Sequence, residues 1–314
     1  MSAAEWFERA APAKVNLFLE VLERRPDGYH ELETVMLALD LADRVRIRRA
    51  PRPGVRCTLS GPFASADVPR DERNLAVRAA LAALALARRM GALGEFEGVE
   101  LELEKWVPSQ AGLGGASSDA AAAFAAVESA LGLSFDEREA CAALAALGSD
   151  CVFFRKAATS GLALCTGRGE IVSALAPAPE NLAVVVVTPD FGAPTAQVYA
   201  QLASPLSWAQ SRRSLPECFR SATSRGSFWS PASRCFNRLE EAAFAALPAL
   251  ADWREILNAN GSAQFSLSGS GSSFFCLCPS RAAAEELRLT VLAELERAGR
   301  HWRGVWACAP IHRF

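Results

Sequence analysis

The sequence predicts an α+β protein with two domains. Strand-like and helix-like segments follow one another in mixed order in both halves, which does not fit the regular alternation of a doubly wound parallel sheet. The 314 residues exceed the usual size of one domain, and 51% of them are hydrophobic, enough to form a core in each half. The segment 204–233 is rich in serine, and we expect it to be an insertion or a long surface loop.

Strands dominate the start of the N-terminal half. Residues 12–24 alternate apolar and polar side chains and end in a turn at 25–28 that contains Pro26 and Gly28. A helix is expected over 74–90. Further strand-like runs are 45–49, 55–59 and 99–105.

A glycine-rich loop then leads into a helix of about 117–131. Ser117 or Ser118 is the expected N-cap, with Asp119 in the first turn, where a carboxylate favours the helix dipole. The next helix, 136–147, is followed by Asp150. Asp150 therefore lies at the end of an element, where functional groups are common.

The C-terminal half begins with a buried strand over 182–188 that contains four consecutive valines. After the serine-rich segment the expected order is helix, strand–loop–strand, long amphipathic helix and final strand. Their ranges are 239–247, 264–278, 281–298 and 304–308.

Composition narrows the class of function. The 33 basic and 35 acidic side chains give a formal charge of −2, which argues against partners such as nucleic acid or an anionic membrane. The nine cysteines form no Cys-x-x-Cys pair, and no apolar stretch approaches the ~20 residues of a membrane span. We therefore expect a cytoplasmic protein that binds a small polar molecule, and the sequence predicts no oligomeric state.

Lysine and tyrosine are scarce. The chain has only three lysines, Lys14, Lys105 and Lys156, and only two tyrosines, Tyr29 and Tyr199. A protein that uses arginine at nearly every basic position is expected to need the lysine amine specifically at the few positions where lysine occurs. Composition alone can also produce such a bias.

The glycine-rich loop has the character of a phosphate cradle. Its glycines allow backbone N–H groups to surround an anion, and the helix that follows adds free donors and partial positive charge. It lacks the Gly-Lys-Ser/Thr of a P-loop and the Gly-x-Gly-x-x-Gly of a dinucleotide fold, and a simple tight turn stays open as an alternative. The candidate nucleotide-binding residues are Pro108, Ser109, Gln110, Ala111, Gly112, Leu113, Gly114, Gly115, Ala116, Ser117 and Ser118.

This loop resembles the ATP-binding motif of the GHMP kinase superfamily. The agreement extends to the segments 12–19, 25–34, 148–150, 167–170 and 268–271. The resemblance implies the two-domain GHMP kinase fold. Residues 1–165 would form an N-terminal α+β nucleotide-binding domain, and 166–314 a C-terminal ferredoxin-like domain that carries the serine-rich insertion.

The resemblance also implies an ATP-dependent small-molecule kinase. It is strongest to the branch that phosphorylates the 2-hydroxyl of a cytidine diphosphate-linked methylerythritol during isoprenoid precursor synthesis. Asp150 would be the general base, and Lys14 would keep it ionised and polarise the acceptor hydroxyl. From the residues alone, Lys14 could be a strand-end surface charge and Asp150 a helix cap. A GHMP kinase with another acceptor and an inactive nucleotide-binding sensor are the alternative functions.

Further site residues follow from the same resemblance. His30 would read the cytosine edge, Tyr29 and Tyr199 would stack on the base, and Asn16 and Thr195 would contact the substrate. Mg²⁺ is expected with ATP, without an assignment of its ligands beyond the candidate Ser117 and Ser118 hydroxyls. The residues expected near adenosine are Asn74 and Lys105. Cys151-Val152 follows Asp150 where the family usually has Val-Pro.

Overall fold

The computed structural model describes residues 5–93, 97–202, 212–216, 235–259, 261 and 263–314. Most of the predicted insertion 204–233 lies outside the described residues.

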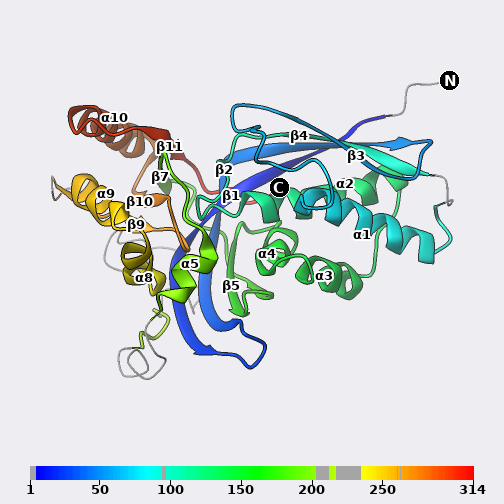
Figure 1. Ribbon diagram of the computed structural model, residues 1–314, viewed down its shortest axis with the longest axis horizontal. Helices are drawn as coiled ribbons and strands as arrows, with labels where there is room; N and C mark the ends of the chain where they lie inside the picture. The colour runs from blue at the N-terminus through cyan, green and yellow to red at the C-terminus, as the bar shows by residue number, and fades with distance from the viewer. Residues whose placement is uncertain (1–4, 94–96, 203–211, 217–234, 260, 262) are drawn as a thin grey trace.

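The first sheet is built around a long antiparallel hairpin of β1 and β2 (Figure 1). Its strand order is β3-β4-β2-β1-β8, and β5 extends from β2 and pairs with β6. The hairpin turns at Gly28, whose φ of 87° suits glycine and whose N–H donates to the Arg25 carbonyl. The strands are β1 (Phe7–Arg24), β2 (His30–Ala50), β3 (Gly54–Ser60), β4 (Gly98–Glu104), β5 (Leu162–Gly167), β6 (Ile171–Ala174) and β8 (Phe236–Asn237).

Four helices follow the first strands and share one core with this sheet (Figure 1). Helix α2 is central to it, because its alanines allow close packing against β1, β2 and helix α1. Phe124 of α2 is fully buried, with its ring 5.5 Å from that of Phe135. The helices are α1 (Leu75–Arg89), α2 (Gly115–Leu131), α3 (Glu137–Ala145) and α4 (Ser149–Lys156).

The second sheet is antiparallel and has the order β11-β7-β10-β9. Numbered along the chain, its strands lie in the order 4-1-3-2, which is the ferredoxin-like arrangement. Its strands are β7 (Ala183–Pro189), β9 (Ser266–Leu267), β10 (Phe274–Cys278) and β11 (Trp302–Cys308). The helices beside it are α5 (Thr195–Ala200), α8 (Leu239–Ala246), α9 (Ala249–Asn258) and α10 (Arg281–Arg297).

The α+β prediction is confirmed, and several elements have the predicted bounds within two residues. The predicted start of α2 is wrong. This helix begins at Gly115, with Gly114 as its N-cap in the left-handed region, so Ser117 and Ser118 lie inside the helix and Asp119 lies beyond its first turn. The part of β2 before residue 45 was not predicted, and neither were β5, β6, β8, α4, α5 and α9. Strand β5 crosses the predicted boundary at 165/166, and that division of the chain stays a prediction.

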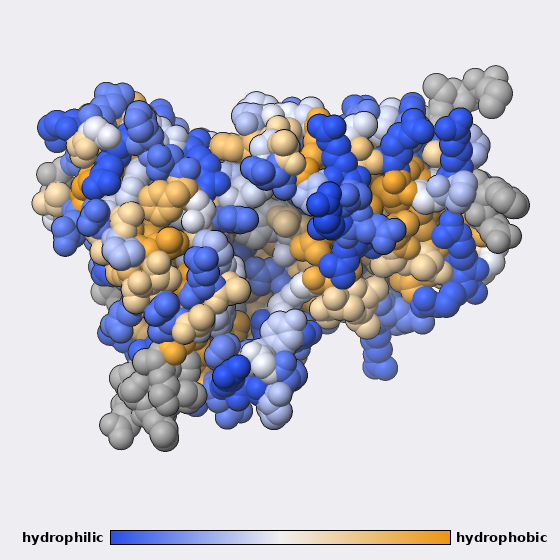
Figure 2. All heavy atoms as spheres, in the orientation of Figure 1, coloured by the Kyte–Doolittle hydropathy of each residue, from blue (hydrophilic) through white to orange (hydrophobic). Residues whose placement is uncertain are grey.

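Among the described residues, no helix combines the length and the apolar character needed to cross a membrane. Figure 2 shows hydrophilic and hydrophobic residues interspersed on one face of the molecule. The same view shows this face hollowed between the part that carries α9 and α10 and the part that carries α1.

The core around α2 makes a prediction about stability. Phe124→Ala removes a fully buried ring and leaves a cavity, so we expect the free energy of unfolding to fall by about 3–5 kcal/mol. Leu289→Ala on α10 is the control, because that side chain is 59% exposed. Urea unfolding of both variants measures the difference, and equal losses would contradict the packing described.

Candidate active site

The glycine-rich loop is held between strand β1 and the loop that joins β9 to β10. The Lys14 backbone N–H donates to the Leu113 carbonyl at 2.9 Å. On the other side, Ser268 Oγ donates to the Gly112 carbonyl at 2.9 Å, and the Ser273 N–H donates to the Ala111 carbonyl at 3.0 Å. The residues that hold the loop thus lie more than 90 positions away from it in the sequence, both before it and after it.

Helix α2 begins directly at the end of this loop. Gly114 has a φ of 71° and provides no side-chain cap, and the first-turn N–H groups of a helix have no acceptor within the helix. A Cβ on Gly114 would lie 2.9 Å from Lys14 Cγ and 3.1 Å from Phe154 Cζ. Glycine therefore lets the loop approach Lys14 closely and leaves donors for an anion at the helix N-terminus.

Lys14 lies beside Asp150 at this end of α2. Its Nζ is 3.6 Å from Asp150 Oδ2 and donates to Asn16 Oδ1 at 2.6 Å. Asn16 in turn donates to Thr34 Oγ1 at 2.8 Å, so its amide is engaged on both sides. The Lys14 side chain is 6% exposed and that of Asp150 is 31% exposed. A nearly buried ammonium thus faces a carboxylate that solvent or a ligand can reach.

Asp150 lies in the first turn of α4, after Gly148. Two other segments approach it. Ser117 of α2 faces this turn, because a Cβ on Gly148 would lie 3.7 Å from Ser117 Oγ. The β5–β6 turn approaches from the other side, where a Cβ on Gly169 would lie 3.8 Å from Asp150 Oδ1. The carboxylate is therefore surrounded by the start of α2, by β1 and by the β5–β6 turn.

Lys105 forms a buried ion-pair cluster behind the loop. Its ammonium donates to Asp43 and, at 2.5 Å, to Asp119 Oδ2. Asp43 Oδ1 also accepts from the backbone N–H of Trp106 and Val107. Burial alone would lower the pKa of Lys105, but the carboxylates of Asp119 and Asp43 raise it above its ordinary value. The cluster joins β2, α2 and the first residues of the loop.

The aromatic candidates make two separate contacts. The rings of His30 and Tyr199 are 5.0 Å apart, and the Arg168 guanidinium carbon lies 4.7 Å from the centre of the Tyr29 ring. Burial, and then the charge of Asp150, raise the pKa of Tyr199 above its usual value. Burial, and then Arg24, lower the pKa of His30, so a neutral imidazole with one donor and one acceptor is favoured.

Two predicted residues have other contacts in the structure. Asn74 caps α1, because its Oδ1 accepts from the Ala76 N–H at 2.9 Å and its Nδ2 donates to the Pro69 carbonyl at 2.8 Å. Thr195 Oγ1 lies 3.0 Å from Ser270 Oγ, which brings α5 to the β9–β10 loop. Thr195 therefore belongs to the wall that closes over the glycine-rich loop.

Sequence reasoning missed Asp43 and Arg168. Asp43 is 1% exposed, and the local signal for it was an acid just before the basic strand segment 45–49. Arg168 stands in the Gly-Arg-Gly-Glu run, a turn signal whose side chain had no assigned role. Both residues contact partners far away in the chain, which local patterns do not show.

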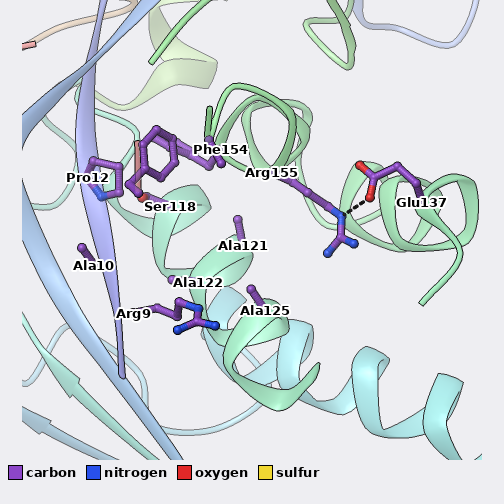
Figure 3. Close-up of a pocket in the computed structure, with 12 residues that line it drawn as sticks. Arg9, Ala10, Pro12, Ser118, Ala121, Ala122, Ala125, Glu137, Phe154 and Arg155 are labelled. Carbon is purple, nitrogen blue, oxygen red and sulfur yellow. Dashed lines mark hydrogen bonds and ion pairs between the residues drawn. The ribbon is translucent and has the colours of Figure 1, made fainter. Parts of the chain in front are cut away.

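A separate cavity of about 240 Å³ lies on the flank of α2 (Figure 3). The Ser118 side chain lines it, and Ser118 Oγ is buried without a hydrogen-bond partner among the described residues. Arg155 at its edge pairs with Glu137 at 2.9 Å. Ser118 thus lies against this cavity, whereas Ser117 faces the start of α4.

The two glycines that bound α2 make a matched test of the loop. Gly114→Ala and Gly132→Ala both force a Cβ onto a positive φ, at a cost of about 1–2 kcal/mol, but only at Gly114 would the Cβ meet Lys14. We expect both variants to lose thermal stability, with the larger loss in Gly114→Ala, and a roughly tenfold or larger loss of affinity for an ATP analogue in Gly114→Ala alone. Isothermal titration calorimetry checks this, and equal affinities in both variants would contradict it.

Comparison with protein families agrees with this geometry. The model "GHMP kinases N terminal domain" matches residues 74–159, and the model "GHMP kinases C terminal" matches residues 222–297. A 4-diphosphocytidyl-2-C-methyl-D-erythritol kinase of Desulfotalea psychrophila is 37% identical over 84% of this chain and 83% of its own. One of the same name from Geobacter sulfurreducens is 36% identical over 93% of this chain and 95% of its own.

Solved structures point the same way. A crystal structure of 4-(cytidine 5'-diphospho)-2C-methyl-D-erythritol kinase has a TM-score of 0.70 and 33% identity, and covers 96% of this chain and 98% of its own. Homoserine kinase from Cytophaga hutchinsonii, at 19% identity and a TM-score of 0.68 over 100% of this chain and 97% of its own, shares the fold. The similarity covers more than four fifths of this chain and of each relative, which shows that the chain belongs to the 4-diphosphocytidyl-2-C-methyl-D-erythritol kinase family of the GHMP kinases.

Proposed function

We propose that this chain transfers the γ-phosphoryl group of ATP to the 2-hydroxyl of 4-diphosphocytidyl-2-C-methyl-D-erythritol. The observation that carries the proposal is the Lys14–Asp150 pair at the N-terminus of α2, directly below the glycine-rich loop. The names of the relatives support the same reaction. The chain would act on this small molecule in the cytoplasm.

Asp150 would act as the general base. As the acceptor oxygen bonds to the γ-phosphorus, the bond from that phosphorus to the β–γ bridging oxygen breaks, ADP leaves, and Asp150 takes the hydroxyl proton. The Lys14 ammonium, 3.6 Å from Asp150 Oδ2, would polarise the acceptor hydroxyl beside the carboxylate. Asn16 holds the ammonium in place, which supports an orienting role, and the substrate contact predicted for Asn16 stays a prediction.

The loop 108–118 would cradle the triphosphate. A loose phosphoryl-transfer transition state gains mainly from alignment and from donors aimed at the phosphate oxygens. The start of α2 offers such donors, since Gly114 leaves them uncapped. Asn74 and Lys105 are engaged by protein partners, so we propose that they shape the nucleotide site through α1 and the loop.

Mg²⁺ would accompany ATP. The described residues contain no group of three or more His, Cys, Asp or Glu side chains suited to a metal, but Mg²⁺ in kinase sites is held largely by phosphate oxygens and one or two carboxylates. Asp119 is bound to Lys105 behind the loop, whereas Ser117 Oγ faces the start of α4 near Asp150, so we propose that Ser117 Oγ would hold the ion. When bound, the ion neutralises charge on the β- and γ-phosphates.

Tyr29, His30 and Tyr199 would bind the cytosine. A neutral His30 can pair with an edge that offers both a donor and an acceptor. Arg168 covers one face of the Tyr29 ring, which leaves the other face for the base. Thr195, in contact with Ser270, would close the site from the second sheet.

A coupled assay of ADP release tests the function. The kinase should release ADP only when 4-diphosphocytidyl-2-C-methyl-D-erythritol is present. Release that needs another alcohol would identify a GHMP kinase with a different acceptor, and ATP binding without release under any condition would identify an inactive sensor.

Asp150→Asn tests the chemical step. The substitution keeps the size of the side chain and removes the proton acceptor, so we expect turnover to fall by about a hundredfold to ten thousandfold while the affinity for an ATP analogue is retained. Steady-state kinetics and calorimetry measure the two quantities. Near-normal turnover in this variant would remove Asp150 from the mechanism.

Tyr199→Ala tests recognition of the base. Loss of one stacking ring should weaken substrate binding by about 1–3 kcal/mol and raise its KM, with the KM for ATP nearly unchanged. Collapse of ATP binding with retained selectivity for cytidine would contradict the assignment.

A further inference from the structure

The turn between β5 and β6 connects the two ends of the proposed substrate site. At one end the Arg168 guanidinium carbon lies 4.7 Å from the centre of the Tyr29 ring. At the other end Gly169 is so close to Asp150 that a Cβ on it would lie 3.8 Å from Oδ1. Because Gly169 has a φ of 110°, the chain turns sharply here and directs two neighbouring residues to the two ends.

Arg168 has unused hydrogen-bonding capacity. Its Nε donates to Glu170 Oε1 at 3.4 Å, and its backbone N–H donates to Glu170 Oε2 at 2.6 Å. Within the described part of the chain, no hydrogen bond engages either Nη group of Arg168. The side chain is 26% exposed, so a ligand can reach it. A guanidinium that is anchored through Nε presents its other donors as a fork suited to phosphate oxygens.

The neighbouring arginine of the β1–β2 turn differs in this respect. Arg25 donates through Nε to Asp27 and through Nη1 to Glu31, at 3.1 and 2.7 Å. Two carboxylates therefore neutralise it. Lys14 is likewise committed to Asp150 and Asn16. Arg168 also pairs with Glu170 and interacts electrostatically with Asp27, but its Nη groups make no hydrogen bond in the described part of the chain, so they can still bind a ligand between Tyr29 and Asp150.

The acceptor proposed above carries its diphosphate between the base and the methylerythritol. If the base stacks on the face of Tyr29 away from Arg168 and the hydroxyl lies at Asp150, the diphosphate would lie between them, near the turn that carries Arg168. We propose that Arg168 binds this diphosphate and makes the site prefer a nucleoside diphosphate to the nucleoside alone. The inference rests on the proposed function and adds a specificity-determining residue to it.

Competition binding separates this role from a structural one. Affinities of CDP and of cytidine are measured by calorimetry in the full chain, saturated with a non-hydrolysable ATP analogue so that neither probe occupies the ATP site. The wild type should bind CDP more tightly than cytidine. Arg168→Gln should reduce this preference by roughly tenfold to a hundredfold, through weaker binding of CDP alone. Arg168→Lys, which keeps the charge but loses the fork, should retain part of the preference.

Arg25→Gln is the matched control, since it removes a nearby arginine whose charge is already paired, and it should leave the preference unchanged. Equal weakening of CDP and cytidine in Arg168→Gln would assign Arg168 to support of Tyr29 and overturn the proposal. An unchanged preference in Arg168→Gln would overturn it as well.

Turnover by the wild type distinguishes failure of the role proposed for Arg168 from failure of the proposed function. If the wild type phosphorylates the cytidine diphosphate-linked acceptor but the preference for CDP survives in Arg168→Gln, only the role of Arg168 is wrong. If the wild type neither turns over that acceptor nor binds CDP, the proposed function fails and the role of Arg168 fails with it.

Discussion

The close approach of Lys14 to the glycine-rich loop is the constraint on which the site depends. The Lys14 backbone holds Leu113, its aliphatic chain lies where a Cβ on Gly114 would stand, and its ammonium faces Asp150. A single strand residue thus sets the distance between the helix N-terminus and the carboxylate. Because phosphoryl transfer is sensitive to alignment, a rigid strand is a better support for this pair than a free loop.

Buried charge fixes the same loop from behind. Lys105 joins Asp43 of β2 to Asp119 of α2, and Asp43 also binds the backbone at Trp106 and Val107. Ion pairs of this kind contribute little net stability, because desolvation offsets much of the attraction, but breaking one leaves an uncompensated charge. The cluster therefore favours one arrangement of strand, loop and helix. The β9–β10 loop completes it from the second sheet through Ser268.

Sequence patterns predicted the helices whose ends depend on residues close by in the chain. Asp136, the first residue of the predicted helix 136–147, is the N-cap of α3, and Gly132, directly after the predicted end at 131, is the C-cap of α2. The predicted N-cap of α2 was wrong because the conformation of Gly114 is set by its packing on Lys14, a hundred positions away. Strands β5 and β6 depend on pairing with β2 and with each other, which periodicity does not reveal. The family motifs located Lys14 and Asp150, whereas the partners Asp43 and Arg168 emerged only from tertiary contacts.

The central claim is that Lys14 and Asp150 act as one unit, and a double-mutant cycle on turnover tests it most directly. It compares Lys14→Met, Asp150→Asn and the double variant with the wild type under saturating substrates. The account predicts that the double variant loses much less than the product of the two single losses, because either substitution alone already disables the pair. Losses that multiply would show that the two residues act independently and would contradict the account.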